Sequence, residues 1–384
     1  MLDEFPLDPS LVYLNHAAVA PWPERTAAAV AAFARQNARR GAADYPEWLK
    51  TERELRGRLQ RLLNAESRDD IALVKNTSEG LSLIAYGLDW RAGDNVVSTD
   101  QEFPSNRIVW QSLAKQGVEF RAADISGDDP EAAIIGALDA RTRLLSVSSV
   151  EYATGLRLDL ERLGEACRAR GILFCIDAIQ SLGAIRFDVL ACHADFVVAD
   201  GHKWMLGPEG LAVFYSKPAA REQLELTQFG WHMVEQAGDF DRPEWTPAKS
   251  ARCFEPGSPN MLGIVALNAS LSLLEEVGMA EVERCVLANA GLLIELLDEL
   301  PDVCLLTPRD EVRHAGIVSF RFEGLDAAAH AAIYRQLMDE GVICAHRAGG
   351  IRFSPHFHTA AEQLQRAVSR AAACRHRPTD QALR

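Results

Sequence analysis

The segment CIDAIQSLGAIRFDVLACHADFVVADGHKWMLGPEG, residues 175–210, decides both the fold and the chemistry. It contains two short apolar runs, of which the first ends at Asp177 and the second ends at Asp200. Such runs predict buried strands of a parallel sheet. Ligands bind at the carboxyl ends of strands in an open α/β sheet, so the residues that follow both runs are expected at a binding site. Lys203 is one of them, in a glycine-rich loop after the second run.

The same alternation of apolar runs and helical stretches extends to both sides of this segment. Two helices are expected between residues 23 and 63, and further helices over 77–88, after Pro104 and over 159–170. Strands are expected at 71–75, 95–98, 143–150, 172–177, 195–200 and 211–215. Short buried strands that alternate with helices predict an α/β fold with a mostly parallel sheet, covered on both faces.

The pattern changes after Pro259. Helices over 260–277 and 280–300 lead to the apolar runs AGIVSFRFEG, VICAH and GIRFS, with a helix near 326–340 and a final helix. This order predicts a smaller C-terminal α+β domain of about a hundred residues. We therefore expect three parts. An N-terminal segment (1–20) packs near the small domain and the active site, a large domain spans 21–258, and a bridging helix and the small domain span 259–384.

Composition restricts the possible partners and location. The net charge of −14 argues against a nucleic-acid partner, because phosphate backbones attract positive surfaces. No apolar run approaches the roughly 20 residues that cross a bilayer, and the N-terminus lacks the features of a signal peptide. We expect a cytoplasmic protein that uses no membrane. The eight cysteines are scattered without a CxxC pair, so they are expected to be reduced and mostly buried.

The residue types around Lys203 are those that pyridoxal 5′-phosphate (PLP) chemistry requires. A lysine amine holds the cofactor and moves the Cα proton, and a carboxylate keeps the pyridine nitrogen protonated. Amides and hydroxyls at a helix start bind phosphate, and an arginine binds the substrate carboxylate through paired hydrogen bonds. For these four roles the sequence offers Lys203, Asp177, the helix start at Thr77–Gly80, and Arg352.

The chain resembles the class V aminotransferase family of fold-type I PLP-dependent enzymes. That group includes cysteine desulfurases, isopenicillin N epimerase-like proteins, and serine and phosphoserine aminotransferases. The resemblance covers nearly the whole chain and implies a large domain with a mostly parallel, seven-stranded-type sheet. Its motifs are YLNHAAVAPWP (13–23), NTSEG (76–80), EFPSN (102–106), DAIQ (177–180), DGHKW (200–204), FEPGSPN (254–260) and GIRFSPHFHT (350–359).

The resemblance also implies roles for individual residues. Lys203 is implied as the Schiff-base lysine and Asp177 as the partner of the pyridine nitrogen, which makes both of them catalytic. Arg352 and His16 are implied to bind the substrate. The remaining implied cofactor contacts are Thr77, Ser78 and His202 at the phosphate, Gln180 at the phenolic oxygen, Phe103 stacked on the ring, Tyr152 over the cofactor oxygen, and Ser258, which the partner subunit of a homodimer donates to the phosphate.

Three positions depart from the cysteine desulfurase pattern. Those enzymes carry a nucleophilic cysteine on a loop before the arginine, whereas the loop here is HRAGG (346–350). Cys344 lies in the apolar run VICAH, where a strand is expected rather than a mobile loop. Phe103 occupies the place of a ring-stacking histidine, which preserves stacking but removes an acid/base group. Asp200 replaces a phosphate-binding serine; because a carboxylate beside a phosphate is unfavourable, Asp200 is expected to turn away or to bond the neighbouring main chain.

Several alternatives stay open. Asp177 could cap the following helix. His346, His356 and His358 lack further ligands at metal-site spacing, so no metal is predicted. The expected activity acts on an amino acid through an external aldimine and a Cα carbanion. Transamination is the first hypothesis, C–S or other β/γ-elimination without a nucleophilic cysteine the second, and epimerisation the third. A PLP-binding sensor or scaffold is the non-enzymatic alternative. Segment 228–250, with two tryptophans, is expected over the substrate entrance.

Overall fold

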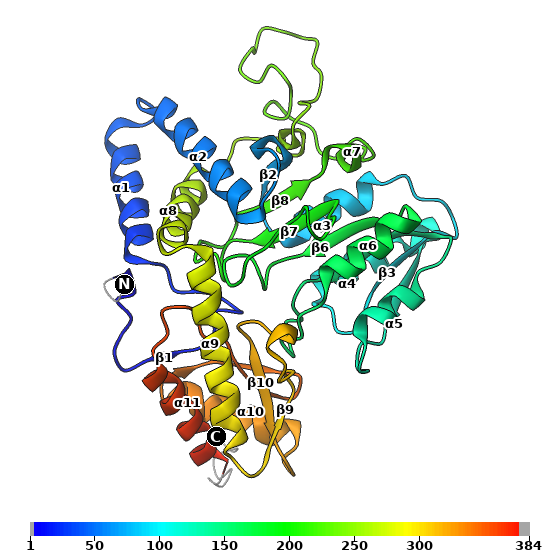
Figure 1. Cartoon of the computed structure of the whole chain (residues 1–384). Coiled ribbons are helices and arrows are strands. Elements are labelled where there is room, and N and C mark those ends of the chain that lie inside the picture. The colour runs from blue at the N-terminus through cyan, green and yellow to red at the C-terminus, as the bar shows by residue number, and fades with distance from the viewer. Residues whose placement is uncertain (1–3, 376–384) are drawn as a thin grey trace, which may run out of the picture.

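A seven-stranded sheet forms the centre of the large domain in the computed structural model, which describes residues 4–375 (Figure 1). Its order is β2-β8-β7-β6-β5-β3-β4, and every neighbouring pair is parallel except the two that involve β8. The predicted mostly parallel sheet is therefore confirmed. The strands are β2 (Ile71–Val74), β3 (Asn95–Thr99), β4 (Glu119–Ala123), β5 (Thr142–Ser148), β6 (Leu173–Asp177), β7 (Phe196–Asp200) and β8 (Ala212–Ser216).

Helices cover both faces of this sheet because its strands are apolar on both sides. Successive side chains of a strand point to opposite faces. Ile176 accordingly belongs to one buried cluster, whereas its neighbour Cys175 belongs to another on the opposite face. The helices of this domain are α1 (Glu24–Arg40), α2 (Tyr45–Leu63), α3 (Thr77–Gly87), α4 (Ser105–Gln111), α5 (Pro130–Ala137), α6 (Leu160–Arg170) and the short α7 (Pro218–Arg221).

The small domain is an antiparallel sheet, ordered β12-β13-β10-β9, that packs against helices. The run VICAH, expected as one strand, is divided: β11 pairs with β1 of the N-terminal segment, whereas β12 pairs with β13. The elements are β1 (Val12–Tyr13), α9 (Met279–Asp298), β9 (Val303–Leu305), β10 (Val318–Phe322), α10 (Ala327–Asp339), β11 (Val342–Ile343), β12 (Ala345–Arg347), β13 (Gly350–Phe353) and α11 (Ala361–Cys374).

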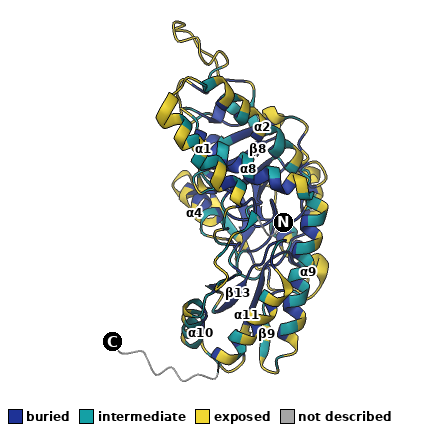
Figure 2. Cartoon of the chain, turned by 90° about the vertical axis from the view of Figure 1, so that its left-hand side faces the viewer, coloured by how far each residue is buried: buried dark blue, intermediate teal, exposed yellow. Residues whose placement is uncertain are grey.

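Helix α8 (Met261–Val277) belongs with the large domain, against which it packs through α1 and α2. The next helix, α9, packs against α11 and β9 and runs along the small domain (Figure 2). The two helices meet at an angle of 85°. Gly278 lies between them with φ +83°, a conformation that other residues rarely adopt. We therefore propose Gly278, rather than residue 259, as the domain boundary.

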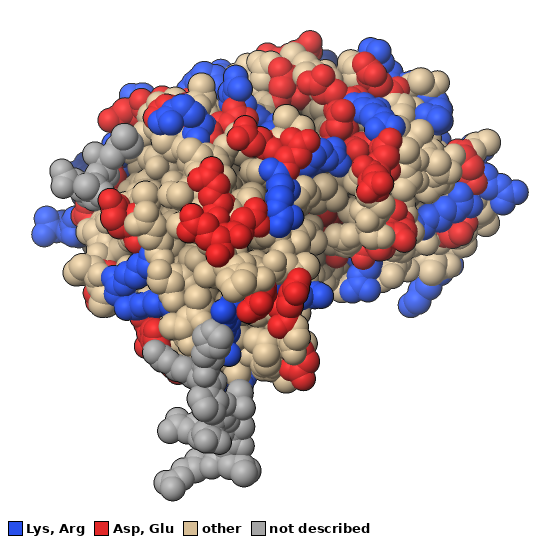
Figure 3. Space-filling model, turned by 60° about the horizontal axis from the view of Figure 1, so that its bottom comes forward, with Lys and Arg blue, Asp and Glu red and all other residues tan. Residues whose placement is uncertain are grey.

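The surface mixes charges of both signs. Acidic and basic side chains are interspersed over the face drawn in Figure 3. No single helix within residues 4–375 is both long and apolar enough to cross a bilayer, and α8 and α9 meet those criteria only as a bent pair. The ends of the expected first and last parts, residues 1–3 and 376–384, lie outside the described residues.

Candidate active site

A cavity of about 360 Å³ lies where β5, β6 and β7 end, between the large and small domains. It also receives residues Ala17–Val19 of the N-terminal segment and two arginines of the small domain. Most of the residues expected at the site meet here, although they are dispersed over the sequence. They are Thr77, Ser78, Phe103, Tyr152, Asp177, Gln180, His202, Lys203 and Arg352.

Lys203 is the buried amine at the centre of this cavity, with 8% of its surface exposed. Burial lowers the pKa of its ammonium group to about 8, although nearby Asp177 opposes the shift. Burial likewise raises the pKa of the Asp177 carboxyl to about 6, with the cation of Lys203 acting in the opposite direction. A lysine with this pKa is a good nucleophile near neutral pH.

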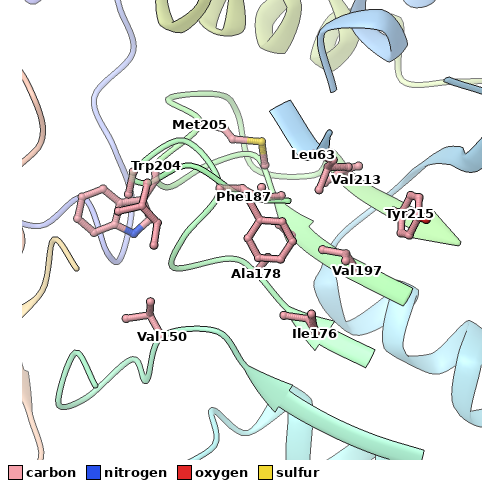
Figure 4. Packing of buried hydrophobic residues seen from close by; sticks show 14 of the residues in the cluster. Leu63, Val150, Ile176, Ala178, Phe187, Val197, Trp204, Met205, Val213 and Tyr215 are labelled. Carbon is pink, nitrogen blue, oxygen red and sulfur yellow. The ribbon is translucent and has the colours of Figure 1, made fainter. Parts of the chain in front are cut away.

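The main chain around Lys203 is held by its neighbour Trp204. The indole is fully buried, and its Nε1 donates a hydrogen bond of 2.8 Å to Oε1 of Gln180. Figure 4 shows Trp204 at one end of the apolar cluster, away from the strands. The loop after β6 approaches so closely that a Cβ on Gly183 would lie 2.3 Å from the Trp204 oxygen. Leu206, also buried, adopts φ 59°, which non-glycine residues rarely do. This packing limits the positions open to the amine.

Two aromatic side chains form one wall of the cavity. The Lys203 Nζ atom lies 5.6 Å from the ring centroid of Phe103. Phe103 meets Tyr152 edge to face, with ring centroids 5.1 Å apart. Phe103 is 40% exposed, so its ring face is available to another flat ring. It can stack on a cofactor, but it cannot donate or accept a proton.

The N-terminus of α3 provides an anion-binding end to the cavity. Asn76 caps the helix by accepting a hydrogen bond of 2.9 Å from the Glu79 amide. The Thr77 hydroxyl is buried without a hydrogen-bond partner among the described residues, and Ser78 donates to Ser105 at 2.9 Å. Helix N-termini bind phosphate through their free amides and positive dipole. An unpaired hydroxyl at this position fits a phosphate oxygen.

His202 and Asp200 form a close pair beside that helix start. Nδ1 of His202 lies 3.0 Å from Oδ1 of Asp200, and both residues line the cavity. The sequence predicted that Asp200 turns away from the phosphate or bonds the neighbouring main chain. In the structure its carboxylate faces the imidazole, which leaves the other ring nitrogen available for an anion.

Arg352 enters the cavity from β13 and is only 1% exposed. Its Nη1 donates a hydrogen bond of 2.6 Å to the main-chain oxygen of Tyr152, while its Nε is buried without a partner among the described residues. Burial, aided by the nearby cation of Arg347, lowers the pKa of the guanidinium to about 9. The group remains charged at neutral pH and can bind a carboxylate.

Two expected site residues lie outside the cavity lining. His16 is fully buried behind it, where its Nδ1 donates a hydrogen bond of 3.0 Å to the Ser354 oxygen. The next three residues, Ala17–Val19, line the cavity instead. Ser258 is exposed and borders a separate surface cavity beside Glu79. The chain's own Ser258 therefore does not reach its own site.

The structure also adds lining residues that the sequence did not single out, namely Asn76, Ser105, Ser148, Ile179, Glu209 and Arg347. The register of the last hairpin would have indicated Arg347, because it lies two residues beyond the position opposite Arg352. Segment 228–250 contributes no lining residue. It projects from the large domain away from the small one (Figure 1), so the prediction that it covers the entrance of this chain's own cavity is wrong.

No cysteine among residues 4–375 lines this cavity. The HRAGG loop is a tight hairpin turn, in which Ala348 (φ 50°) and Gly349 (φ 70°) connect β12 directly to β13. Cys344 is 1% exposed, and burial raises the pKa of its thiol to about 12. A reactive cysteine needs an accessible thiolate, which this position does not provide.

Comparisons with known proteins identify a family and similar sequences. The model of the family described as Aminotransferase class-V matches residues 12–367. A probable cysteine desulfurase of Methanothermobacter thermautotrophicus is 30% identical over 94% of each chain. A cysteine desulfurase of Pectobacterium carotovorum is 32% identical, covering 69% of this chain and 65% of the relative.

Solved structures give the same fold. An apo cysteine desulfurase from Thermococcus onnurineus has a TM-score of 0.82 at 27% identity and covers 95% of each chain. The cystine C–S lyase C-DES, in complex with its reaction product cysteine persulfide, has a TM-score of 0.88 at 24% identity. That match covers 96% of this chain and 99% of C-DES. At this identity the likeness to C-DES concerns the fold alone.

Proposed function

The chain belongs to the class V aminotransferase family of PLP-dependent enzymes, and we propose that it is a C–S lyase without a nucleophilic cysteine of its own. The observation that carries this proposal is the tight hairpin turn at Ala348 and Gly349. The family resemblance implies that cysteine desulfurases carry their reactive thiol on the corresponding loop, and the turn in this chain contains none. The nearest cysteine, Cys344, is buried and protonated at neutral pH. Because no enzyme thiol can accept the sulfur, the sulfur must depart as part of the substrate's own leaving group.

The residues present fit PLP. Lys203 would hold the cofactor covalently through Nζ, and Asp177 would face the pyridine nitrogen. Thr77, Ser78 and His202 would bind the phosphate at the α3 N-terminus, where the Thr77 hydroxyl lacks another partner. When bound, PLP supplies an electron sink that stabilises negative charge at the substrate Cα.

The chain's own side chains then have defined tasks. Arg352 holds the α-carboxylate, which fixes the orientation of the Cα–H bond. Once the substrate amine has displaced it from the cofactor, Nζ of Lys203 would take the Cα proton, while Asp177 would keep a proton on the pyridine nitrogen. The Cβ–S bond breaks, and the sulfur departs with the bonding electron pair. Water then releases the remaining three-carbon fragment as pyruvate and ammonia, so atoms and electrons balance.

Phe103 favours a particular leaving group. Its ring offers no proton for a departing sulfur, whereas an imidazole would. A sulfur anion that is stabilised by a neighbouring sulfur needs less assistance than a simple thiolate. We therefore propose a disulfide amino acid such as cystine as the substrate type, with a persulfide as the second product.

Transamination is the second candidate. The same replacement by Phe103 supports it, because exchange of an amino group with a keto acid needs no proton donor at the β-carbon. Lys203, Asp177 and Arg352 would serve it in the same way. Whether the enzyme eliminates or transaminates would then depend on the substituent at the substrate's β-carbon, and not on any residue that lines the cavity.

The test uses PLP-loaded protein with cystine, cysteine, cystathionine and a panel of amino acids paired with keto acids. Pyruvate and persulfide from cystine, undiminished in Cys344→Ala and lost in Lys203→Ala, are expected. Alanine formed from cysteine in a reaction that requires Cys344 would show a desulfurase and overturn the proposal. A new amino acid from a keto acid would establish transamination, and D-amino acids would establish epimerisation. Cofactor binding without turnover would indicate a sensor.

We also propose a homodimer in which Ser258 reaches the partner's cavity. This is supported by its exposed position beside α3 and its absence from its own cavity. Light scattering should give twice the chain mass, and Ser258→Ala should weaken PLP binding. A monomer that binds PLP fully would contradict this proposal.

A further inference from the structure

We infer that Arg347 is a second carboxylate-binding residue of this cavity, so that the preferred substrate carries a distal carboxylate besides the α-carboxylate held by Arg352. The inference rests on the proposed action on an amino acid at this site, and it specifies the substrate class. It does not depend on whether the reaction is elimination or transamination.

The geometry of the last hairpin places both arginines on one face. In the β12–β13 pair, Ala345 lies opposite Arg352 and Arg347 lies opposite Gly350. Residues two apart on a strand point to the same side. Arg347 and Arg352 are therefore diagonal neighbours, at a typical separation of about 7–8 Å. Both side chains line the same cavity.

The hairpin fixes the main chain at Arg347, whose side chain is exposed. A two-residue turn with positive φ at Ala348 and Gly349 leaves little freedom between the strands. From β10, the guanidinium of Arg321 hydrogen-bonds the Ala348 oxygen, through Nε at 2.9 Å and also through Nη2. A preorganised cation binds an anion with less loss of conformational entropy than a mobile one.

Neither cavity arginine has a carboxylate partner among residues 4–375. The hydrogen bond recorded for the Arg347 side chain is a local one, from Nη1 to the His346 oxygen at 2.8 Å. Other arginines that pack around the small domain are paired, such as Arg309 with Asp298 and Arg313 with Glu131. The charge of Arg347 instead lowers the pKa of Arg352, and both arginines lower the pKa of Lys203. Two neighbouring cations without counterions match a ligand that carries two anionic groups.

The distribution of charge in the cavity points the same way. The acidic lining residues Asp177, Asp200 and Glu209 all belong to the large domain, whereas both arginines belong to the small domain. Lys203 would be joined to the cofactor, and His202 faces the phosphate end. A second carboxylate would therefore find its binding partner at Arg347. A guanidinium can bind it through two parallel hydrogen bonds. For the proposed lyase, a disulfide with an amino-acid carboxylate on each half has this form.

The first experiment measures binding without turnover. Glutarate and butyrate are titrated calorimetrically into the PLP-loaded protein. Each carries one carboxylate, and only glutarate carries a second. We expect glutarate to bind roughly tenfold or more tightly, as for a charge-assisted hydrogen-bonded pair. Arg347→Gln should remove this preference, and Arg347→Lys should keep part of it. Arg335→Gln, an exposed substitution on α10 outside the cavity lining, is the matched control and should keep all of it.

The second experiment separates binding from chemistry. With cystine, Arg347→Gln should raise KM while kcat changes little, and with a monocarboxylic amino acid neither should change. Equal affinity of the unchanged protein for glutarate and butyrate would overturn the inference, as would a preference that survives Arg347→Gln. If the proposed lyase reaction fails, the glutarate preference remains. If only the Arg347 role fails, pyruvate still forms while the preference is absent, so the two failures are distinguishable.

Discussion

Nη1 of Arg352 donates a hydrogen bond of 2.6 Å to the main-chain oxygen of Tyr152, which links the small domain to the wall of the cavity in the large domain. The residue expected to bind the substrate carboxylate is thus oriented by the contact between domains. Its Nε remains buried without a partner among the described residues. A bound carboxylate would satisfy part of that guanidinium.

The first prediction concerns this arginine. Arg352→Lys keeps a positive charge but loses the planar fork, so kcat/KM should fall by about ten- to a hundredfold. Steady-state kinetics with cystine measure the loss, and visible spectra check that PLP binding is unchanged. An unaltered KM in this variant would remove the proposed role of Arg352 in substrate binding.

The second prediction concerns the pH dependence of cofactor attachment to Lys203. Only the neutral amine can attack the cofactor aldehyde, and burial lowers its pKa from 10.5 to about 8. Attachment of PLP to the apo-protein should therefore accelerate as pH rises through about 8. Stopped-flow absorbance measures this rate, with Lys203→Ala as the unreactive control. A midpoint above pH 10 would show that the amine is not perturbed.

A third prediction assigns Asp200 a task. The carboxylate near Nδ1 of His202 should orient the imidazole so that its other ring nitrogen faces the phosphate, which strengthens phosphate binding. Asp200→Asn should weaken PLP binding by about tenfold, with little effect on pyridoxal, which lacks the phosphate. Fluorescence titrations of both compounds make the comparison. Tighter PLP binding in the variant would show instead that Asp200 repels the phosphate.

The fourth prediction tests the absence of a reactive thiol. Cys344→Ala should leave kcat unchanged but reduce the free energy of unfolding by about 1 kcal/mol, because it leaves a small void in a packed core. Denaturant unfolding gives the stability, and pyruvate release gives the rate. The Cys344 thiol in the folded protein should also react slowly with alkylating reagents at pH 7, because its pKa is raised to about 12. Rapid modification with loss of activity would contradict the proposed mechanism.

The sequence alone was sufficient to predict the central sheet and the proximity of the residues at the centre of the site. Short, strongly apolar runs such as those of β6 and β7 are typical of strands that are buried on both faces of a sheet. Asp177 ends β6 and Lys203 follows β7, and parallel strands end at one edge of a sheet, so their proximity was predictable. The edge strand β4 was missed because its charged residues, Glu119 and Arg121, weaken the apolar pattern.

Contacts between distant segments decided the rest. One apolar run became two strands because Val342 pairs with Val12, more than three hundred residues away, whereas Ala345 pairs with Arg352. The same long-range packing buried His16 behind the cavity and turned Arg347 into it. Local residue patterns specify which segments form strands and helices. The partners of those segments, and the side chains that share a cavity, depend on packing energies that arise only when the chain is folded.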